Sequence, residues 1–177
     1  GELESGGTMM IVICLALGAL IGELINIEAG MEKFGEWLKY KTKSESDTGF
    51  VSAFVNASLT VCIGAMAVVG AIQDGIYGDY SILSAKAVLD LIIIMVMTAA
   101  QGKGCIFSAI PVGIFQGLMT LFARALEPVL TTQALNNLSL IGSILIFCVG
   151  LNLVWGKKIK VANLLPSLVL AVLWTFI

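Results

Sequence analysis

Long runs of apolar residues fill most of the chain, and polar residues gather in short stretches between them. Each run has at least 17 residues, about the length a helix needs to cross the hydrocarbon core of a bilayer. None alternates apolar and polar residues with a period of two, which favours helices over a transmembrane barrel. We therefore predict an all-α, polytopic transmembrane bundle in a single domain, with about six spans at 9–27, 50–72, 82–100, 105–123, 138–155 and 161–177.

One connection, 28–49, is longer than the others and has a mixed pattern. Phe34, Trp37 and Leu38 recur at helical spacing among lysines and glutamates. Such a segment either lies along the membrane surface as an amphipathic helix or continues the preceding span into the cytoplasm.

Composition strengthens the membrane prediction and narrows the chemistry. Apolar residues make up 58% of the 177 residues and charged residues 12%, and the mean hydropathy is +0.99. These values exclude a soluble enzyme, a nucleic-acid-binding protein and a disulfide scaffold. The chain has no histidine, the commonest metal ligand and general base, so we expect no metal, no cofactor and no enzymatic activity. The four cysteines stand in separate apolar runs, which is typical of small buried apolar side chains.

Basic residues predict the orientation. Eight of the ten fall in the first, third and fifth connections, and Lys86 and Arg124 are assigned to the second and fourth. The positive-inside rule then predicts a multi-pass protein of the prokaryotic inner membrane, with both ends of this chain away from the cytoplasm. Because the chain begins without an initiator methionine or a signal-peptide pattern, we expect it to start within a longer protein.

Glycines predict close helix packing. Gly18 and Gly22 form one GxxxG pattern, and Gly113 and Gly117 form another. Small residues let transmembrane helices approach closely. The patterns indicate either packing within one protomer or a homo-oligomer held by glycine-rich faces.

Polar residues within or beside the spans are the candidate solute-binding residues. Lys86 and Asp90 stand one helical turn apart, so they form either a structural ion pair or part of a polar cavity in which Asp90 binds a cation or proton. The segment QDGIYGD, 73–79, places further acids beside Gly75 and Gly78, which permit a sharp turn. Pro166 interrupts the last span, and a break of this kind at membrane depth often lines a cavity. The full candidate set is Asn56, Gln73, Asp74, Asp79, Lys86, Asp90, Asn152 and Asn163.

Four segments together resemble a family of prokaryotic membrane proteins, domain-of-unknown-function family 554. They are GALIGELINIE (18–28), FVNASLTVCIGAMAVVGAIQDGIYGD (54–79), SILSAKAVLD (81–90) and GLNLVWGKKIKVANLLP (150–166). The resemblance implies a multi-spanning protein, described at most as a transporter, with no established substrate. It also implies about two further apolar segments before the GALIGE helix.

Three functions fit this pattern. The leading hypothesis is a transporter or channel-like permease for a small solute or ion, with the lipid bilayer as its surroundings and no nucleic acid as partner. A noncatalytic membrane scaffold or accessory subunit is the alternative, and it predicts dry packing around Lys86 and Asp90. An intramembrane aspartyl hydrolase using Asp79 and Asp90 is a third, but the YGD tripeptide has the wrong glycine spacing for the GxGD pattern. A faint duplication of a glycine-rich helix, a polar link and a second helix indicates inverted repeats.

Overall fold

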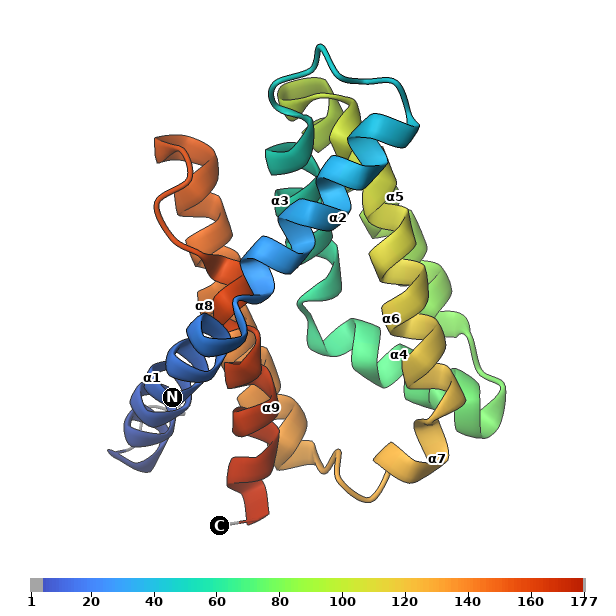
Figure 1. Ribbon diagram of the computed structural model, residues 1–177. Helices are drawn as coiled ribbons and strands as arrows, with labels where there is room; N and C mark the ends of the chain where they lie inside the picture. Colours follow the sequence, from blue (N-terminus) through green and yellow to red (C-terminus); the bar gives the residue numbers. More distant parts are fainter. Residues whose placement is uncertain (1–4, 177) are drawn as a thin grey trace. The chain divides into compact units, whose positions relative to one another are not determined.

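The computed structural model describes residues 5–176 and is all-α over that range, with side-chain positions described from residue 7. Contacts divide it into two compact units. Unit 1 comprises the described residues up to Glu28 together with those from Pro128 onward, and unit 2 comprises Ala29–Glu127. The helices are α1 (Ser5–Ile25), α2 (Ile27–Lys41), α3 (Phe50–Cys62), α4 (Ala65–Tyr77), α5 (Ser81–Gln101), η1 (Lys103–Ser108), α6 (Ala109–Leu121), α7 (Ala123–Leu126), α8 (Thr132–Trp155), η2 (Val161–Leu164), α9 (Pro166–Leu173) and η3 (Trp174–Phe176), coloured along the sequence in Figure 1.

Unit 1 is built around α9 and the short helix η2, which pack against α1 and α8. The approach of α1 depends on glycine. A Cβ on Gly18 would lie 2.6 Å from the Cβ of Ser167, and one on Gly22 would lie 1.7 Å from the backbone oxygen of Asn163. The predicted packing within one protomer is therefore confirmed for this GxxxG pair. Gly113 and Gly117 have open space where a Cβ would be, so a face between copies stays a prediction for them.

Unit 2 packs α3 against η1, α5 and α6, and α4 against α5, α6 and α7 (Figure 1). The closest approach is again at glycine, because a Cβ on Gly104 would lie 2.1 Å from the backbone oxygen of Phe50. The rings of Phe50 and Phe107 also meet at a tilt, with centroids 5.5 Å apart. These contacts hold η1 against the start of α3.

Within residues 5–176, four helical segments are long and apolar enough to cross a membrane, and they match four of the predicted spans. They cover Gly7–Ile25, Ser81–Gln101, Lys103–Leu121 and Thr132–Trp155. On α5, only 11% of the most hydropathic stretch is buried inside the structure. An outward face this apolar suits contact with lipid tails rather than water.

Two predicted spans differ from the structure. The run at 50–72 is two helices, α3 and α4, bent by 61° at a break of a few residues. The last run is a shorter apolar segment, Val161–Phe176, and residue 177 lies outside the described residues. Pro166 starts α9 instead of breaking a helix, because a proline in the first turn of a helix removes no helical hydrogen bond.

Of three local predictions, one is confirmed and two need correction. Gly78 makes the expected turn, with φ of 68°, and ends α4. Gly75 does not turn the chain: it lies inside α4, where a Cβ would be 2.4 Å from the backbone oxygen of Thr120. Lys86 lies inside α5 and not in a connection, so the basic residues divide eight to one between the predicted sides. This ratio gives a stronger positive-inside bias than the predicted eight to two.

The long connection forms a separate helix. Asn26 has a φ of 54°, a left-handed conformation that ends α1 before α2 begins. Plain continuation of the first span is therefore wrong. On α2, Phe34 stacks on Trp37 and tilts against Phe54 of α3, with centroids 5.8 Å apart in each pair. The location of α2 at the membrane surface stays a prediction.

Candidate functional site

A buried ion pair lies near the middle of α5. Lys86 is 6% exposed, and its Nζ donates to the Val61 backbone oxygen over 3.0 Å and pairs with the Asp90 carboxylate. Asp90 is nine residues into α5, which places it about 13 Å along a helix of about 30 Å. A charge at that depth costs roughly 2.5–3.5 kcal/mol on insertion scales, so each member of the pair needs the other.

The second partner of Lys86 exists because the preceding span is broken. Val61 is in the last turn of α3, where backbone oxygens have no helical N–H to accept from. The C-terminal end of a helix also carries a partial negative charge, which favours a cation. The ammonium group of Lys86 therefore caps α3 while it pairs with Asp90.

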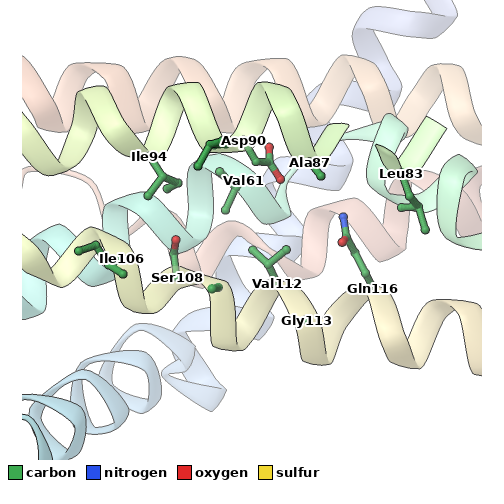
Figure 2. Close-up of a pocket in the computed structure, with 12 residues that line it drawn as sticks. Val61, Leu83, Ala87, Asp90, Ile94, Ile106, Ser108, Val112, Gly113 and Gln116 are labelled. Carbon is green, nitrogen blue, oxygen red and sulfur yellow. The ribbon is translucent and has the colours of Figure 1, made fainter. Parts of the chain in front are cut away.

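Asp90 also faces a cavity of about 420 Å³ that lies between α5 and the segment formed by η1 and α6. In Figure 2, Asp90 points from α5 toward the same space into which Ser108, Val112 and Gln116 point from η1 and α6. The side chain of Asp90 is 21% exposed and that of Lys86 is 8% exposed. The cavity is lined by Val61, Leu83, Ala87, Asp90, Leu91, Ile94, Ile106, Ser108, Ala109, Val112, Gly113 and Gln116.

The wall of this cavity is mostly hydrocarbon. Asp90, Ser108 and Gln116 are its polar side chains, and Ser108 is buried. Within the described part of the chain, no group of three His, Cys, Asp or Glu side chains is placed to hold a metal ion. What the site offers chemically is one carboxylate and two neutral hydrogen-bonding groups in an apolar surround.

Four other candidate residues of unit 2 lie outside this cavity. Asn56 donates to the side chain of Gln101 over 3.2 Å. Gln73 and Asp74 are half-buried on the last turns of α4. Asp79 is exposed and accepts hydrogen bonds from the backbone N–H of Ser81 over 3.0 Å and from its hydroxyl over 2.5 Å. Of the predicted unit 2 set, only Asp90 therefore lines the cavity, and Lys86 pairs with it from outside the cavity wall.

Asn152 and Asn163 belong to unit 1, where Asn152 binds the backbone of a turn and Asn163 binds Glu28 and Glu23. Asn152 Oδ1 accepts from the N–H groups of Lys158 and Ile159 at 3.0 and 2.9 Å, and its Nδ2 donates to the Ile159 oxygen. Asn163 accepts from the backbone N–H of Glu28 over 2.8 Å and donates to Glu23 over 2.6 Å. Their predicted role in binding a solute stays untested, but their polar atoms already have partners.

Sequence reasoning missed Ser108 and the backbone oxygen of Val61. Ser108 is one small hydroxyl in an apolar run, and nothing in its neighbourhood marks it. The break beside Val61 did carry a signal, because Gly64 falls in the middle of a run that is long enough to span. We predicted one continuous span there, whereas Gly64 precedes α4 with open space around it.

Comparison with known proteins now places the chain. A model of the family described as "Protein of unknown function (DUF554)" matches residues 1–176. The chain belongs to the DUF554 family. No solved structure matches the DUF554 chain.

Two curated relatives of the DUF554 chain are bacterial. It is 32% identical over 167 residues to the uncharacterized membrane protein YdfK of Bacillus subtilis, covering 94% of this chain and 70% of that protein. It is 30% identical over 164 residues to the uncharacterized protein YqgA of Escherichia coli, covering 90% and 70% respectively. The DUF554 chain is thus a multi-pass membrane protein with bacterial relatives.

Proposed function

We propose that the DUF554 chain is a permease for a small solute, and that the solute passes beside Asp90 in unit 2. The observation that supports this most is the cavity of about 420 Å³ on which a mid-span carboxylate opens. A purely structural ion pair needs no such space, and apolar residues of equal volume would stabilise the fold at least as well. A buried Lys86 and a partly buried Asp90 in mid-span are more readily explained by a polar species that must bind there.

The broken span adds a second argument. Irregular backbone at membrane depth is tolerated where it is enclosed in protein or lines a cavity, and discontinuous helices are common at the binding sites of transporters. Here the last turn of α3 contributes Val61 to the cavity wall and an oxygen to Lys86. The Lys86–Asp90 pair and the break between α3 and α4 therefore belong to the same site.

The alternatives receive less support. A scaffold predicts dry packing around Lys86 and Asp90, whereas Asp90 lines a cavity. An aspartyl hydrolase needs two carboxylates close enough to share a proton. Asp79 precedes α5 and Asp90 lies nine residues after its start, which separates them by roughly 15 Å along the helix. We therefore propose a nonenzymatic role in the bacterial inner membrane, with both ends of the chain away from the cytoplasm.

The test is transport by the purified chain in liposomes, with a matched pair of substitutions on α6. Gly113 lines the cavity and Gly117, one turn later, does not, yet both have open space around them. Gly113→Leu should therefore obstruct the cavity, while Gly117→Leu adds the same side chain to the same helix outside it. Asp90→Asn removes the charge without changing the shape.

The probes are concentration jumps of sodium, potassium, ethylammonium, acetate and alanine, read as current or as uptake of labelled solute. We expect at least one probe to cross with the wild type and with Gly117→Leu, and its rate to fall about tenfold or more with Gly113→Leu and Asp90→Asn. Equal rates for Gly113→Leu and the wild type would overturn the proposal, and so would the absence of flux for all five probes.

A further inference from the structure

We propose that the cavity beside Asp90 binds a small organic ammonium compound, an ammonium group on an apolar body, and that Lys86 competes with this ligand for Asp90. This inference rests on the proposed function and names its ligand class.

The lining fits an organic cation better than a bare metal ion. Hard cations take six or more oxygen ligands, but the side chains here supply one carboxylate, one hydroxyl and one amide. The rest of the wall is aliphatic, including Leu83, Ile94 and Val112. A cation that carries its own hydrocarbon gains from burial against that wall at roughly 25 cal/mol per Å², and needs only one charged partner.

The present partner of Asp90 has the same chemistry. Lys86 is a primary ammonium on an alkyl chain, and it pairs with Asp90 from a buried position outside the cavity wall. The carboxylate thus already binds a group of the proposed class. Asp90 lines the cavity and Lys86 does not, so a ligand in the cavity meets the carboxylate that Lys86 holds.

Lys86 keeps a hydrogen-bond acceptor when it releases Asp90. Its Nζ also donates to Val61 at the C-terminal end of α3, where the helix dipole favours a cation. Exchange of one ammonium for another at Asp90 therefore leaves neither lysine nor carboxylate without a partner. Cys62 is the titratable neighbour that interacts electrostatically with both; the other titratable groups on elements packed against α5 are Asp74 and Tyr77 on α4 and Lys103 and Cys105 on η1.

The rim of the cavity is accessible from the lipid-facing surface. Leu91 is 59% exposed and Ile106 is 55% exposed, and both line the cavity. In a membrane span, such residues contact hydrocarbon. A ligand with an apolar body partitions into that environment and reaches the cavity laterally, whereas a small hydrated ion does not.

The test compares three probes of equal chain length with the purified chain in detergent: n-butylammonium, n-butanol and butyrate, titrated by calorimetry at constant ionic strength. We expect n-butylammonium to bind at least about tenfold more tightly than the neutral and anionic probes. Gly113→Leu should weaken its binding and Gly117→Leu should not. Equal affinity for butylammonium and butanol would overturn the proposal.

Substitution of Lys86 tests the competition directly. Lys86→Met removes the competing ammonium and should tighten butylammonium binding by about tenfold, while Lys86→Arg keeps a cation and should stay near the wild type. Unchanged affinity in a folded Lys86→Met variant would contradict the competition. If that variant does not fold, the preference of the wild type among the three probes still decides the ligand class.

The failures of the two proposals differ. If butylammonium does not bind but Gly113→Leu still blocks flux of sodium, potassium, acetate or alanine, the ligand class is wrong and the permease stands. If butylammonium binds with the expected preference but no solute crosses the liposome, the binding site stands and the permease is overturned.

Discussion

Units 1 and 2 contain the same local arrangement but use polar residues in it differently. In unit 1, α8 ends at Gly156, with φ of 77° and ψ of 177°, and in unit 2, α5 ends at Gly102, with φ of 102° and ψ of −177°. A lysine follows each glycine, and a 3-10 helix begins at that lysine in unit 2 and at Val161 in unit 1. The next helix has a proline in its first turn in both units. We call the segments 156–165 and 102–108 the return turns.

Polar side chains hold the return turn of unit 1. Glu28, whose side chain is 6% exposed, accepts the backbone N–H of Ala162 over 3.0 Å and pairs with Lys157 over 2.9 Å. Asn152 and Asn163 bind further backbone groups, as described above. Close packing holds the return turn of unit 2 instead, with Gly104 on Phe50 and the thiol of Cys105 3.6 Å from the Ala53 oxygen.

The difference shows where polarity is structural and where it is available to a ligand. Unit 1 uses acids and amides to satisfy backbone groups that a turn would otherwise leave unpaired. Unit 2 makes an equivalent turn without acids or amides. Its charged pair, Lys86 and Asp90, lies instead in the middle of α5, where Asp90 faces a cavity. The presence of a polar residue in a span is thus a weaker guide to function than what that residue binds.

The largest effect is expected from the glycines that both return turns need. Gly22→Ala would place a Cβ 1.7 Å from the Asn163 oxygen, and Gly104→Ala would place one 2.1 Å from the Phe50 oxygen. Because backbone atoms cannot move aside as a side chain end can, each should lower the free energy of unfolding by about 3 kcal/mol or more. Detergent-induced unfolding followed by tryptophan fluorescence measures this.

The control for both is Gly117→Ala, where nothing lies within 4 Å of the added atom. Alanine there should raise stability by about 0.5–1 kcal/mol because it favours the helix. A tolerated Gly22→Ala with a damaging Gly104→Ala would mean that the polar contacts of unit 1 fix its turn without close packing, and the proposed likeness of the two turns would be lost.

The sequence predicted the fold class because apolar runs of span length report directly on helices in a bilayer. It did not predict the break at Ile63, since Gly64 sits in a run whose average hydropathy is that of an ordinary span. Gly18 and Gly22 were assigned correctly to packing, but Gly75, in the same kind of helix, was taken for a turn. Glycine can serve either packing or a turn, and only the tertiary contact of Gly75 with Thr120 shows that Gly75 serves packing.

The candidate site was predictable only in part, for a related reason. Lys86 and Asp90 share a helical face by spacing alone, so their pairing follows from the sequence. The cavity depends on the distance between α5 and α6 and on Ser108. Residue spacing along one helix gives no information about either. Asn152 and Asn163 stand among apolar residues as Asp90 does, and only their hydrogen bonds show a structural use. Asn152 binds the backbone of the return turn, and Asn163, within that turn, binds the Glu28 N–H and the Glu23 carboxylate.

A smaller effect separates the two acids near the return turn of unit 1. Glu28→Gln weakens a buried ion pair whose lysine side chain is 45% exposed, so we expect a loss of about 2 kcal/mol in the free energy of unfolding. Glu23→Gln is the matched control: its carboxylate is 56% exposed and pairs with the exposed Lys160. Such exposed pairs contribute little to stability, so this substitution should cost less than Glu28→Gln.

The same unfolding assay at two salt concentrations sharpens this contrast. The contribution of Glu23 should decrease at high salt, and that of Glu28 should persist, because burial limits screening. Equal losses for the two substitutions would show that Glu28 contributes no more than a surface pair, and the description of unit 1 as held by polar contacts would fail.

The smallest expected effect concerns the first turns of α5 and α8, which are capped by different chemistry. Asp79 accepts from the hydroxyl and the backbone N–H of Ser81, and these hydrogen bonds lower the pKa of the Asp79 carboxyl below its ordinary value. At the start of α8, the hydroxyl of Thr131 accepts from the N–H of Ala134 over 3.2 Å. The first acceptor titrates and the second does not.

Protonation therefore should loosen only one of the two caps. Because the folded-state pKa of Asp79 is lowered, its stabilisation is present above the unfolded pKa of about 4 and is lost as the pH falls through the folded value. Hydrogen-exchange protection of the Ser81 amide should thus fall below about pH 4, while that of Ala134 stays constant. Asp79→Asn keeps an acceptor oxygen without the titration, so protection in that variant should not depend on pH; an unchanged pH dependence would assign the effect to another group.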